Sequence, residues 1–126
     1  MQKYTQDQAA GESVTDITTF EKVEMRVGRV IGCTEFPEAR KPSYKLEIDF
    51  GPLGLRHSSA QLTAHYAPAD VIGKLVVAVV NFPPRRIAGF SSEVLVLGVP
   101  GQGVRPEGTV VLLQPERSVE PGSRVF

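Results

Sequence analysis

The chain has a single cysteine among its 126 residues and contains no long apolar run. Cys33 cannot form a disulfide within one chain, and a membrane-spanning helix needs about 20 consecutive apolar residues. The polar segment at residues 1–13 also lacks the basic and then apolar regions of a signal peptide. These absences predict a cytoplasmic protein without membrane insertion. The chain is long enough to bury a core without disulfides or a structural metal.

A strong charge of one sign is also absent, because 14 basic and 14 acidic side chains give a formal net charge of zero. The charge is uneven along the chain: residues 1–25 have a net charge of −3, residues 26–90 of +4 and residues 91–126 of −1. The positive middle segment can steer an anion but is modest beside a dedicated nucleic-acid binder. A solvated surface of mixed charge explains the same pattern equally well.

The chain lacks the residue spacings of a catalytic or metal site. His57 precedes Ser58, but neighbours in a strand point to opposite faces, which makes them a poor base and nucleophile. Cys33, His57 and His65 are not at ligand spacing, and a structural zinc site needs four ligands. The glycine-rich residues 98–103 lack the lysine and helix of a phosphate-binding loop. We therefore expect no enzyme activity, no cofactor and no metal.

Apolar residues in β patterns are what the chain does contain. From residue 44 to 50 they alternate with charged residues, which predicts a half-buried strand with one wet face. Residues 75–80 have no polar interruption, which predicts a central strand buried on both faces. Other expected strands are residues 25–33, with a β-bulge at Gly28 and Arg29, and residues 55–60, 94–99, 109–114 and 124–126.

Short helical segments are expected between these strands. Thr18 and Glu21 have the spacing of a capping box, which predicts a helix at residues 18–23. Residues 61–66 and 68–73 are expected to form helical turns, the second beginning with proline and ending with glycine. Five or more strands with a helical insert after the third predict an all-β fold, a five-stranded closed barrel with the insert at one end.

The most distinctive segment is NFPPRRIAGFSSE, at residues 81–93. Pro83 and Pro84 fix φ and donate no backbone hydrogen bond, so the preceding strand must end there. Gly89 supplies backbone freedom at the other end. A loop stiffened by proline, tipped with arginine and flanked by Phe82 and Phe90 loses little conformational entropy on binding, which suits an anionic or amphipathic partner.

Two adjacent arginines, Arg85 and Arg86, are the strongest candidates for ligand contact. In an extended loop their side chains point to opposite sides, so one can face a ligand while the other pairs with an acid or crosses a dimer interface. Arginine is well suited to bind phosphate and carboxylate groups. The alternative is a structural salt bridge, for example with Glu93.

A second candidate site lies at residues 36–42, between the first two expected strands. Phe36 can make apolar contact with a peptide or stack on a base, while Arg40 and Lys41 contact the ligand at the rim. Barrels of this class bind ligands through such loops and an open strand face. The alternative is a solvated turn with a half-buried phenylalanine.

A third candidate follows the expected strand at residues 55–60. Ser58 and Ser59 are small enough to let a ligand backbone approach closely, and the amide of Gln61 can donate and accept hydrogen bonds. The alternative is that the small residues pack tightly against the helical insert. The sequence does not decide between the two.

The order of these segments resembles the tRNA-binding-domain family, and within it the CsaA group of small dimeric proteins. The resemblance begins near residue 17 and extends to the C-terminus. Residues 1–16 have no counterpart and are expected to form a flexible tail, and residues 103–108 are longer than the usual link. The segments that carry the resemblance are residues 20–22, 25–30, 35–40, 46–51, 58–61 and 81–98.

This resemblance implies an oligonucleotide/oligosaccharide-binding (OB) barrel at residues 17–126 that forms a homodimer. It implies an ATP-independent chaperone that holds unfolded or export-bound polypeptides in a groove; the alternative is tRNA binding through the same basic surface. Polypeptide is favoured because the chain has no basic tail and no lysine cluster. Exposed apolar residues near Phe20, Val23 and Val125 are candidates for the dimer interface. The expected binding residues are Phe36, Arg40, Lys41, Lys45, Ser58, Ser59, Gln61, Asn81, Phe82, Arg85, Arg86, Ser91 and Ser92.

Overall fold

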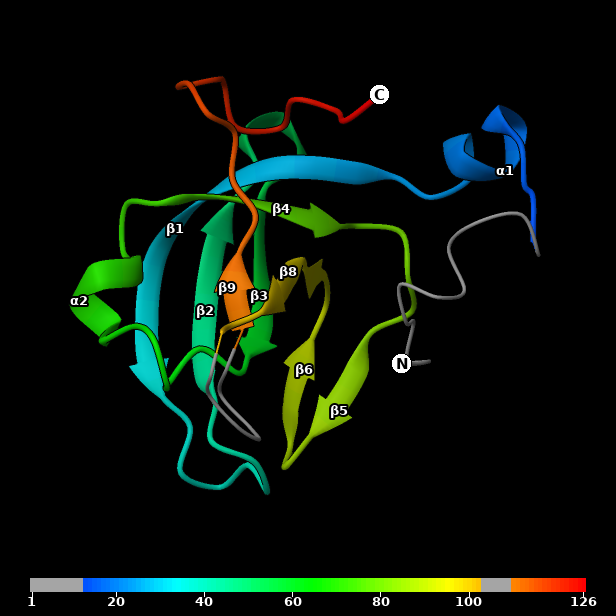
Figure 1. Cartoon of the computed structure of the whole chain (residues 1–126). Helices are drawn as coiled ribbons and strands as arrows, with labels where there is room; N and C mark the ends of the chain where they lie inside the picture. Colours follow the sequence, from blue (N-terminus) through cyan, green and yellow to red (C-terminus); the bar gives the residue numbers. More distant parts are fainter. Residues whose placement is uncertain (1–12, 103–109) are drawn as a thin grey trace.

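The computed structural model describes residues 13–102 and 110–126, which fold mainly into β-strands (Figure 1). Residues 1–12 of the expected tail, residues 103–108 of the expected last loop and Thr109 of the expected strand at 109–114 lie outside the described residues. The elements in chain order are α1 (Ile17–Glu21), β1 (Met25–Glu35), β2 (Tyr44–Asp49), the 3₁₀ helix η2 (Gly51–Leu53), β3 (Leu55–Ala60), α2 (Pro68–Val71), β4 (Leu75–Val79), β5 (Arg85–Ile87), β6 (Phe90–Ser92), β7 (Leu95–Val96), β8 (Gly98–Pro100) and β9 (Val110–Leu112).

Five strands form one antiparallel sheet in the order β3-β2-β1-β4-β7. The sheet curls until its two edges meet. The backbone N–H of Glu93 donates to the carbonyl oxygen of His57 at 2.8 Å, and the N–H of Ser59 donates to Oγ of Ser92 at 3.0 Å. Because these bonds join β3 to the chain beside β7, the barrel is nearly closed. The predicted all-β, five-stranded barrel is confirmed.

The alternation at residues 44–50 produces the core as predicted. Leu46, Ile48 and Phe50 are buried inside the barrel, whereas the charged residues between them lie at its surface. Leu62 and Val71, from the segment after β3 and from α2, are also fully buried and join this core. The predicted helical insert therefore contributes side chains to the barrel interior.

Two local predictions for the N-terminal half were wrong. The register between β1 and β2 shifts between Val30 and Gly32, whereas β1 pairs with β4 without interruption at Gly28. Glycine is required at position 28 for a different reason: a Cβ there would lie 2.5 Å from Cγ2 of Ile48. The predicted N-terminal helix is present as α1, but its cap is Asp16 and not Thr18. Oδ1 of Asp16 accepts a hydrogen bond from the N–H of Thr19 at 2.9 Å, and hydrogen bonding from Thr19 lowers the pKa of the Asp16 carboxyl.

The expected strand at residues 124–126 is reduced to a single bridge between Arg26 and Arg124. Among the residues of the folded part that the structure describes, no helix is long and apolar enough to cross a membrane.

Candidate functional site

The segment at residues 81–93 is not a simple loop but contains the β5–β6 hairpin, which projects from the barrel (Figure 1). Pro83 and Pro84 precede β5, so the predicted end of the preceding strand is confirmed. The turn residues Ala88 and Gly89 have φ angles of 49° and 81°. Two successive left-handed residues match the twist of the flanking strands, which makes the hairpin a stiff support for its side chains.

Arg85 and Arg86 lie on β5 opposite Ser92 and Ser91. Both arginines are exposed, and as neighbours on a strand they point to opposite faces of the hairpin. Within residues 13–102 and 110–126 neither arginine forms an ion pair. The alternative of a salt bridge with Glu93 is not what the structure shows, because that carboxylate binds His57.

A pair of phenylalanine rings joins the hairpin to the loop after β1. The centroids of Phe36 and Phe90 are 5.4 Å apart, with an angle of 67° between the ring planes. Nζ of Lys45 lies over both rings, 4.8 Å from the centroid of Phe36 and 5.4 Å from that of Phe90. The structure therefore brings together two residues predicted separately, Phe36 and Lys45, with one that sequence reasoning did not select as a binding residue, Phe90.

Two carboxylates and an imidazole extend this group of side chains along β2 and β3. The ring of His57 lies 6.2 Å from that of Phe90, edge to face. Its Nδ1 is 3.3 Å from Oε1 of Glu93, and its Nε2 is 3.7 Å from Oε2 of Glu47. Glu47 and His57 were missed, although Glu47 shares the parity of Lys45 on the predicted strand. We call the following residues the charged aromatic cluster: Phe36, Lys45, Glu47, His57, Phe90 and Glu93.

A surface pocket of about 370 Å³ lies next to Phe36. Arg40 lines this pocket and is exposed, whereas Lys41 is exposed but does not line it. The pocket extends the surface of the charged aromatic cluster into the loop between β1 and β2. Its other lining residues are Glu35, Pro37, Ala39, Pro42, Ser43, Tyr44 and Thr63.

The predicted serines separate into different roles. Ser58 is fully buried, and its hydroxyl lies within hydrogen-bond distance of the carbonyl oxygens of Ser59 and Val94, between which its one hydrogen is shared, so tight packing describes it. Ser59 is half-buried, lies opposite Lys45, and is bound through its N–H to the hydroxyl of Ser92. Ser91 and Gln61 are also half-buried, on β6 and directly after β3. Ser59 and Ser92 therefore position the hairpin beside the cluster.

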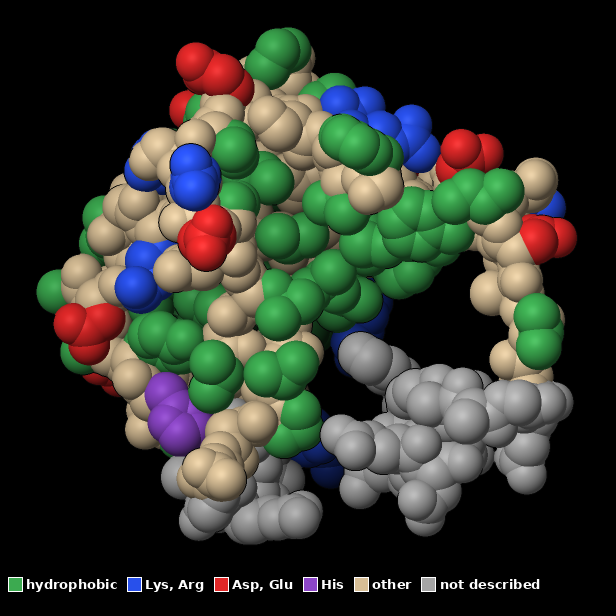
Figure 2. All heavy atoms as spheres, turned by 45° about the horizontal axis from the view of Figure 1, so that its top comes forward, with side chains coloured by type: hydrophobic (Ala, Val, Ile, Leu, Met, Phe, Trp, Pro, Cys, Tyr) green, Lys and Arg blue, Asp and Glu red, His purple; other side chains and the backbone are tan. Residues whose placement is uncertain are grey.

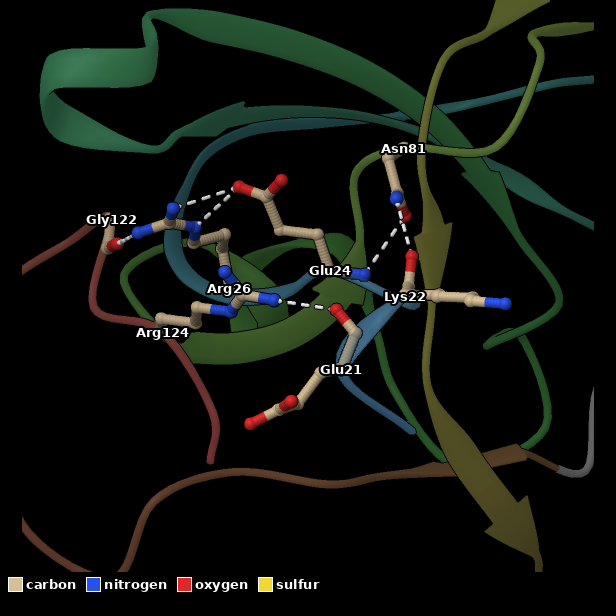
Figure 3. Close-up of polar contacts among 7 residues, drawn as sticks. All are labelled: Glu21, Lys22, Glu24, Arg26, Asn81, Gly122 and Arg124. Atoms are coloured by element: carbon tan, nitrogen blue, oxygen red, sulfur yellow. Dashed lines mark hydrogen bonds and ion pairs between the residues drawn. The ribbon is translucent and has the colours of Figure 1, made fainter. Parts of the chain in front are cut away.

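Asn81 has a structural position at the end of β4 (Figure 3). Its Nδ2 donates to the carbonyl oxygen of Lys22 at 2.8 Å, and its Oδ1 accepts from the N–H of Glu24 at 2.9 Å. Both ends of the amide are thus bound to the segment between α1 and β1. The next residue, Phe82, is 46% exposed.

The same region ties the C-terminal segment to β1 (Figure 3). The guanidinium of Arg26 contacts the Glu24 carboxylate at 2.8 Å and donates to the carbonyl oxygen of Gly122 at 2.9 Å. Nη2 of Arg124 donates to the carbonyl oxygen of Glu21 at 2.9 Å. These bonds hold the two terminal segments together around a pocket of about 460 Å³, lined by Ile17, Phe20, Glu21, Arg124, Val125 and Phe126.

The outer surface of β4, β7, β8 and β9 is apolar, unlike the outer surface of β2. Val77 lies beside Leu97, because the N–H of Leu97 donates to the carbonyl oxygen of Val77 at 2.9 Å. Val99 and Val111 are paired, and two residues further along the ribbon the N–H of Leu113 donates to the carbonyl oxygen of Leu97 at 3.2 Å. These side chains point away from the barrel interior, because Leu112 between them is buried in the core. We call this surface the apolar face; its residues are Val77, Leu95, Leu97, Val99, Val111 and Leu113.

The side chains of the apolar face are exposed at the surface of the barrel. Val99 is 46% exposed and Leu113 is 41% exposed. Figure 2 shows hydrophobic side chains forming a continuous surface that runs from the front of the barrel toward the α1 end. β4 is indeed central, paired with β1 and β7, but only part of its outer side is buried: Val79 is buried and Val77 is not.

Cys33 and Tyr44 are ionisable residues buried in the core. Cys33 is buried, and burial raises the pKa of its thiol to about 11, so the thiol is neutral at ordinary pH. Burial also raises the pKa of the Tyr44 hydroxyl, which donates to the carbonyl oxygen of Tyr66 at 2.8 Å. Among the residues that the structure describes, no group of three or more His, Cys, Asp or Glu side chains is placed to hold a metal ion.

A family model described as a putative tRNA binding domain matches residues 25–124. Similar curated proteins include methionine–tRNA ligases from Porphyromonas gingivalis, 36% identical over 106 residues, and from Sorangium cellulosum, 37% identical over 109 residues. These matches cover 84% and 86% of this chain but only 15% of each ligase. The chain therefore spans a small part of the length of these relatives.

Similar solved structures include two chaperones. Chaperone CsaA from Bacillus anthracis is 50% identical with a TM-score of 0.81, and CsaA from Picrophilus torridus is 43% identical with the same score. Each match covers 90% of this chain and 100% of the other. A MetRS related protein from Pyrococcus horikoshii is 26% identical with a TM-score of 0.77, over 90% of this chain and 99% of that one. These findings confirm the predicted resemblance and the predicted barrel.

Proposed function

The chain belongs to the putative tRNA-binding-domain family, and we propose that within this family it is an ATP-independent molecular chaperone of the cytoplasm. Its ligands are unfolded or export-bound polypeptides. They bind on the charged aromatic cluster and along the β5–β6 hairpin. The similarity to two CsaA chaperones supports this proposal at the level of the whole domain.

The composition of the charged aromatic cluster is the observation that carries the proposal. It combines two aromatic rings with one ammonium group and two carboxylates, those of Glu47 and Glu93. A nucleic-acid backbone carries one negative charge per phosphate and is repelled by carboxylates at the contact surface. An unfolded polypeptide offers apolar side chains and charges of both signs, so it can complement each part of this surface.

A homodimer is part of this proposal, and the apolar face supports it. The outer face of an antiparallel sheet is polar when it faces water, as Lys45, Glu47 and Asp49 show on β2. On the other side of the barrel the outward-facing residues Val99 and Leu113 are apolar although they are exposed. A second copy of the chain offers a surface of the same kind, which buries both faces in a two-fold interface. The pocket between the terminal segments, whose lining includes Ile17, Phe20 and Val125, provides a second place for such a contact.

Suppression of aggregation tests the chaperone function. A client enzyme unfolded in guanidinium is diluted into buffer without ATP, and light scattering is followed with one dimer of this protein per client. We expect scattering to fall with the natural sequence and to recover with Phe90→Ala. Leu55→Ala is the control, because Leu55 is an exposed apolar residue on β3 that belongs neither to the cluster nor to the expected binding residues. Unchanged scattering with the natural sequence would count against the proposal.

Binding of tRNA is the second candidate function. The observation that favours it is the pair of exposed guanidinium groups of Arg85 and Arg86 on a stiff hairpin, together with the family match. Phosphate contacts release counterions, so tRNA affinity should fall steeply with salt and should weaken for all tRNAs in an Arg85→Ala, Arg86→Ala variant. Absence of tRNA binding at low salt would exclude this function. Competition between tRNA and an unfolded peptide shows whether they share one surface.

A further inference from the structure

Lys45 covers the two rings of the charged aromatic cluster instead of pairing with an acid. Its ammonium lies 4.8 Å from the centroid of Phe36 and 5.4 Å from the centroid of Phe90. Glu47 lies on the same face of β2, but its carboxylate is directed to His57 at 3.7 Å. In the part of the chain that the structure describes, no carboxylate lies within ion-pair distance of Lys45.

The rings beneath Lys45 form a corner. Phe36 and Phe90 meet at 67°, which leaves two ring faces directed toward the position of the ammonium. Phe36 is only 3% exposed although it lies directly after the end of β1 and beside an open surface pocket. A partly exposed contact between an ammonium and a ring is weak, so a group that fits the corner better can replace it.

The strands on both sides of Lys45 leave room for the side chain to move. Its register partners are Thr34 on β1 and Ser59 on β3, both small polar residues. A lysine side chain is long and flexible, and it can turn over these residues without displacing a bulky neighbour. The hairpin itself does not need to move, because Ser59 and Ser92 hold it through a hydrogen bond at 3.0 Å.

We propose that Lys45 is a displaceable cover over an aromatic subsite made by Phe36 and Phe90, and that this subsite binds an aromatic side chain of a polypeptide ligand. We expect a third ring to take the place of the ammonium at this corner, because aromatic rings prefer offset-stacked or edge-to-face contacts. The carboxylates of Glu47 and Glu93 disfavour the phosphate that accompanies every nucleobase. This inference rests on the proposed chaperone function and adds to it a preference for aromatic residues.

The test uses two unfolded peptides that differ only in one residue, phenylalanine or alanine, and measures their affinities by fluorescence anisotropy. Lys45→Ala should strengthen binding of the phenylalanine peptide by about two- to fivefold, because the ligand no longer has to displace the ammonium from the rings, and should leave the alanine peptide unchanged. Lys22→Ala is the control, because Lys22 is an exposed lysine between α1 and β1, outside the cluster and outside the expected binding residues. Phe90→Leu should abolish the preference for phenylalanine.

Proton NMR reports the displacement directly. Ring currents should shift the side-chain methylene signals of Lys45 in the free protein, and the phenylalanine peptide should return them toward ordinary values. Weaker binding of the phenylalanine peptide by Lys45→Ala, or equal changes for both peptides, would overturn the inference while leaving the chaperone function intact. If neither the natural sequence nor any variant binds either peptide, both this inference and the proposed chaperone function are overturned. Stronger binding of single-stranded RNA alone by Lys45→Ala would assign the subsite to bases and overturn the polypeptide assignment.

Discussion

The carboxylate of Glu93 binds His57 at two points. Its Oε1 accepts a hydrogen bond from the backbone N–H of His57 at 2.7 Å and lies 3.3 Å from Nδ1 of the ring. In the opposite direction, the N–H of Glu93 donates to the carbonyl oxygen of His57 at 2.8 Å. These contacts join the outer edge of β3 to the residue that follows β6. They therefore close the barrel and also fix the acidic part of the charged aromatic cluster.

Replacing Glu93 by alanine should weaken this closure. The backbone N–H of His57 loses its acceptor, which should lower the free energy of unfolding by about 1–2 kcal/mol. Urea denaturation followed by circular dichroism measures the change. Glu38→Ala is the control, because Glu38 is an exposed glutamate in the loop between β1 and β2. Equal stability of the two variants would mean that the Glu93 carboxylate does not support the barrel.

Replacing Asn81 by alanine should loosen the segment between α1 and β1. Two backbone groups, the carbonyl oxygen of Lys22 and the N–H of Glu24, lose a partner, at a cost of about 1–2 kcal/mol. Hydrogen exchange should accelerate at the amide of Glu24, and urea denaturation should show the loss of stability. Gln114→Ala removes an exposed amide and should change neither measurement. Unchanged exchange at Glu24 in the Asn81 variant would contradict this role.

Gly28→Ala should destabilise the core, whereas Gly32→Ala on the same strand should not. A Cβ at position 28 would lie 2.5 Å from Cγ2 of Ile48 and 2.8 Å from Cε1 of Phe50, so the core must shift. Overpacking of this kind costs about 1–3 kcal/mol. At position 32 the nearest atom is Cβ of Glu47 at 3.4 Å, close to ordinary contact. Thermal unfolding of the two variants compares them, and equal melting temperatures would refute the packing argument.

Local patterns in the sequence were enough to predict the barrel. The alternation at residues 44–50 identifies the wall of the core, because each apolar residue faces the same side. Pro83 and Pro84 mark the end of β4 because they cannot donate to a ladder. The β5–β6 hairpin was not predicted, since Ala-Gly is not the usual turn pair and the strands carry arginine and serine rather than alternating apolar residues.

The candidate site was harder to predict because its contacts are distant in sequence. Phe36 follows β1 whereas Phe90 begins β6, and only the closed barrel brings them together. The role of Asn81 depends on backbone groups 57 and 59 residues away, to which no side-chain pattern points. Ser58 looked like its neighbour Ser59, but strand alternation turns one into the core and the other toward Lys45.

The apolar face gives the sharpest test of the proposed dimer. Val99→Asp places a charge in the middle of this face, and burial of an unpaired carboxylate should weaken dimerisation by about 100-fold or more. Leu55→Asp is the matched control, because Leu55 is 52% exposed and Val99 is 46% exposed, while Leu55 lies on β3 outside the apolar face. Sedimentation equilibrium should find the natural sequence and Leu55→Asp as dimers and Val99→Asp as a folded monomer. If Val99→Asp is still a dimer, the interface does not lie on the apolar face, and the pocket between the terminal segments is the next surface to change. If the natural sequence is a monomer, the proposed dimer is refuted.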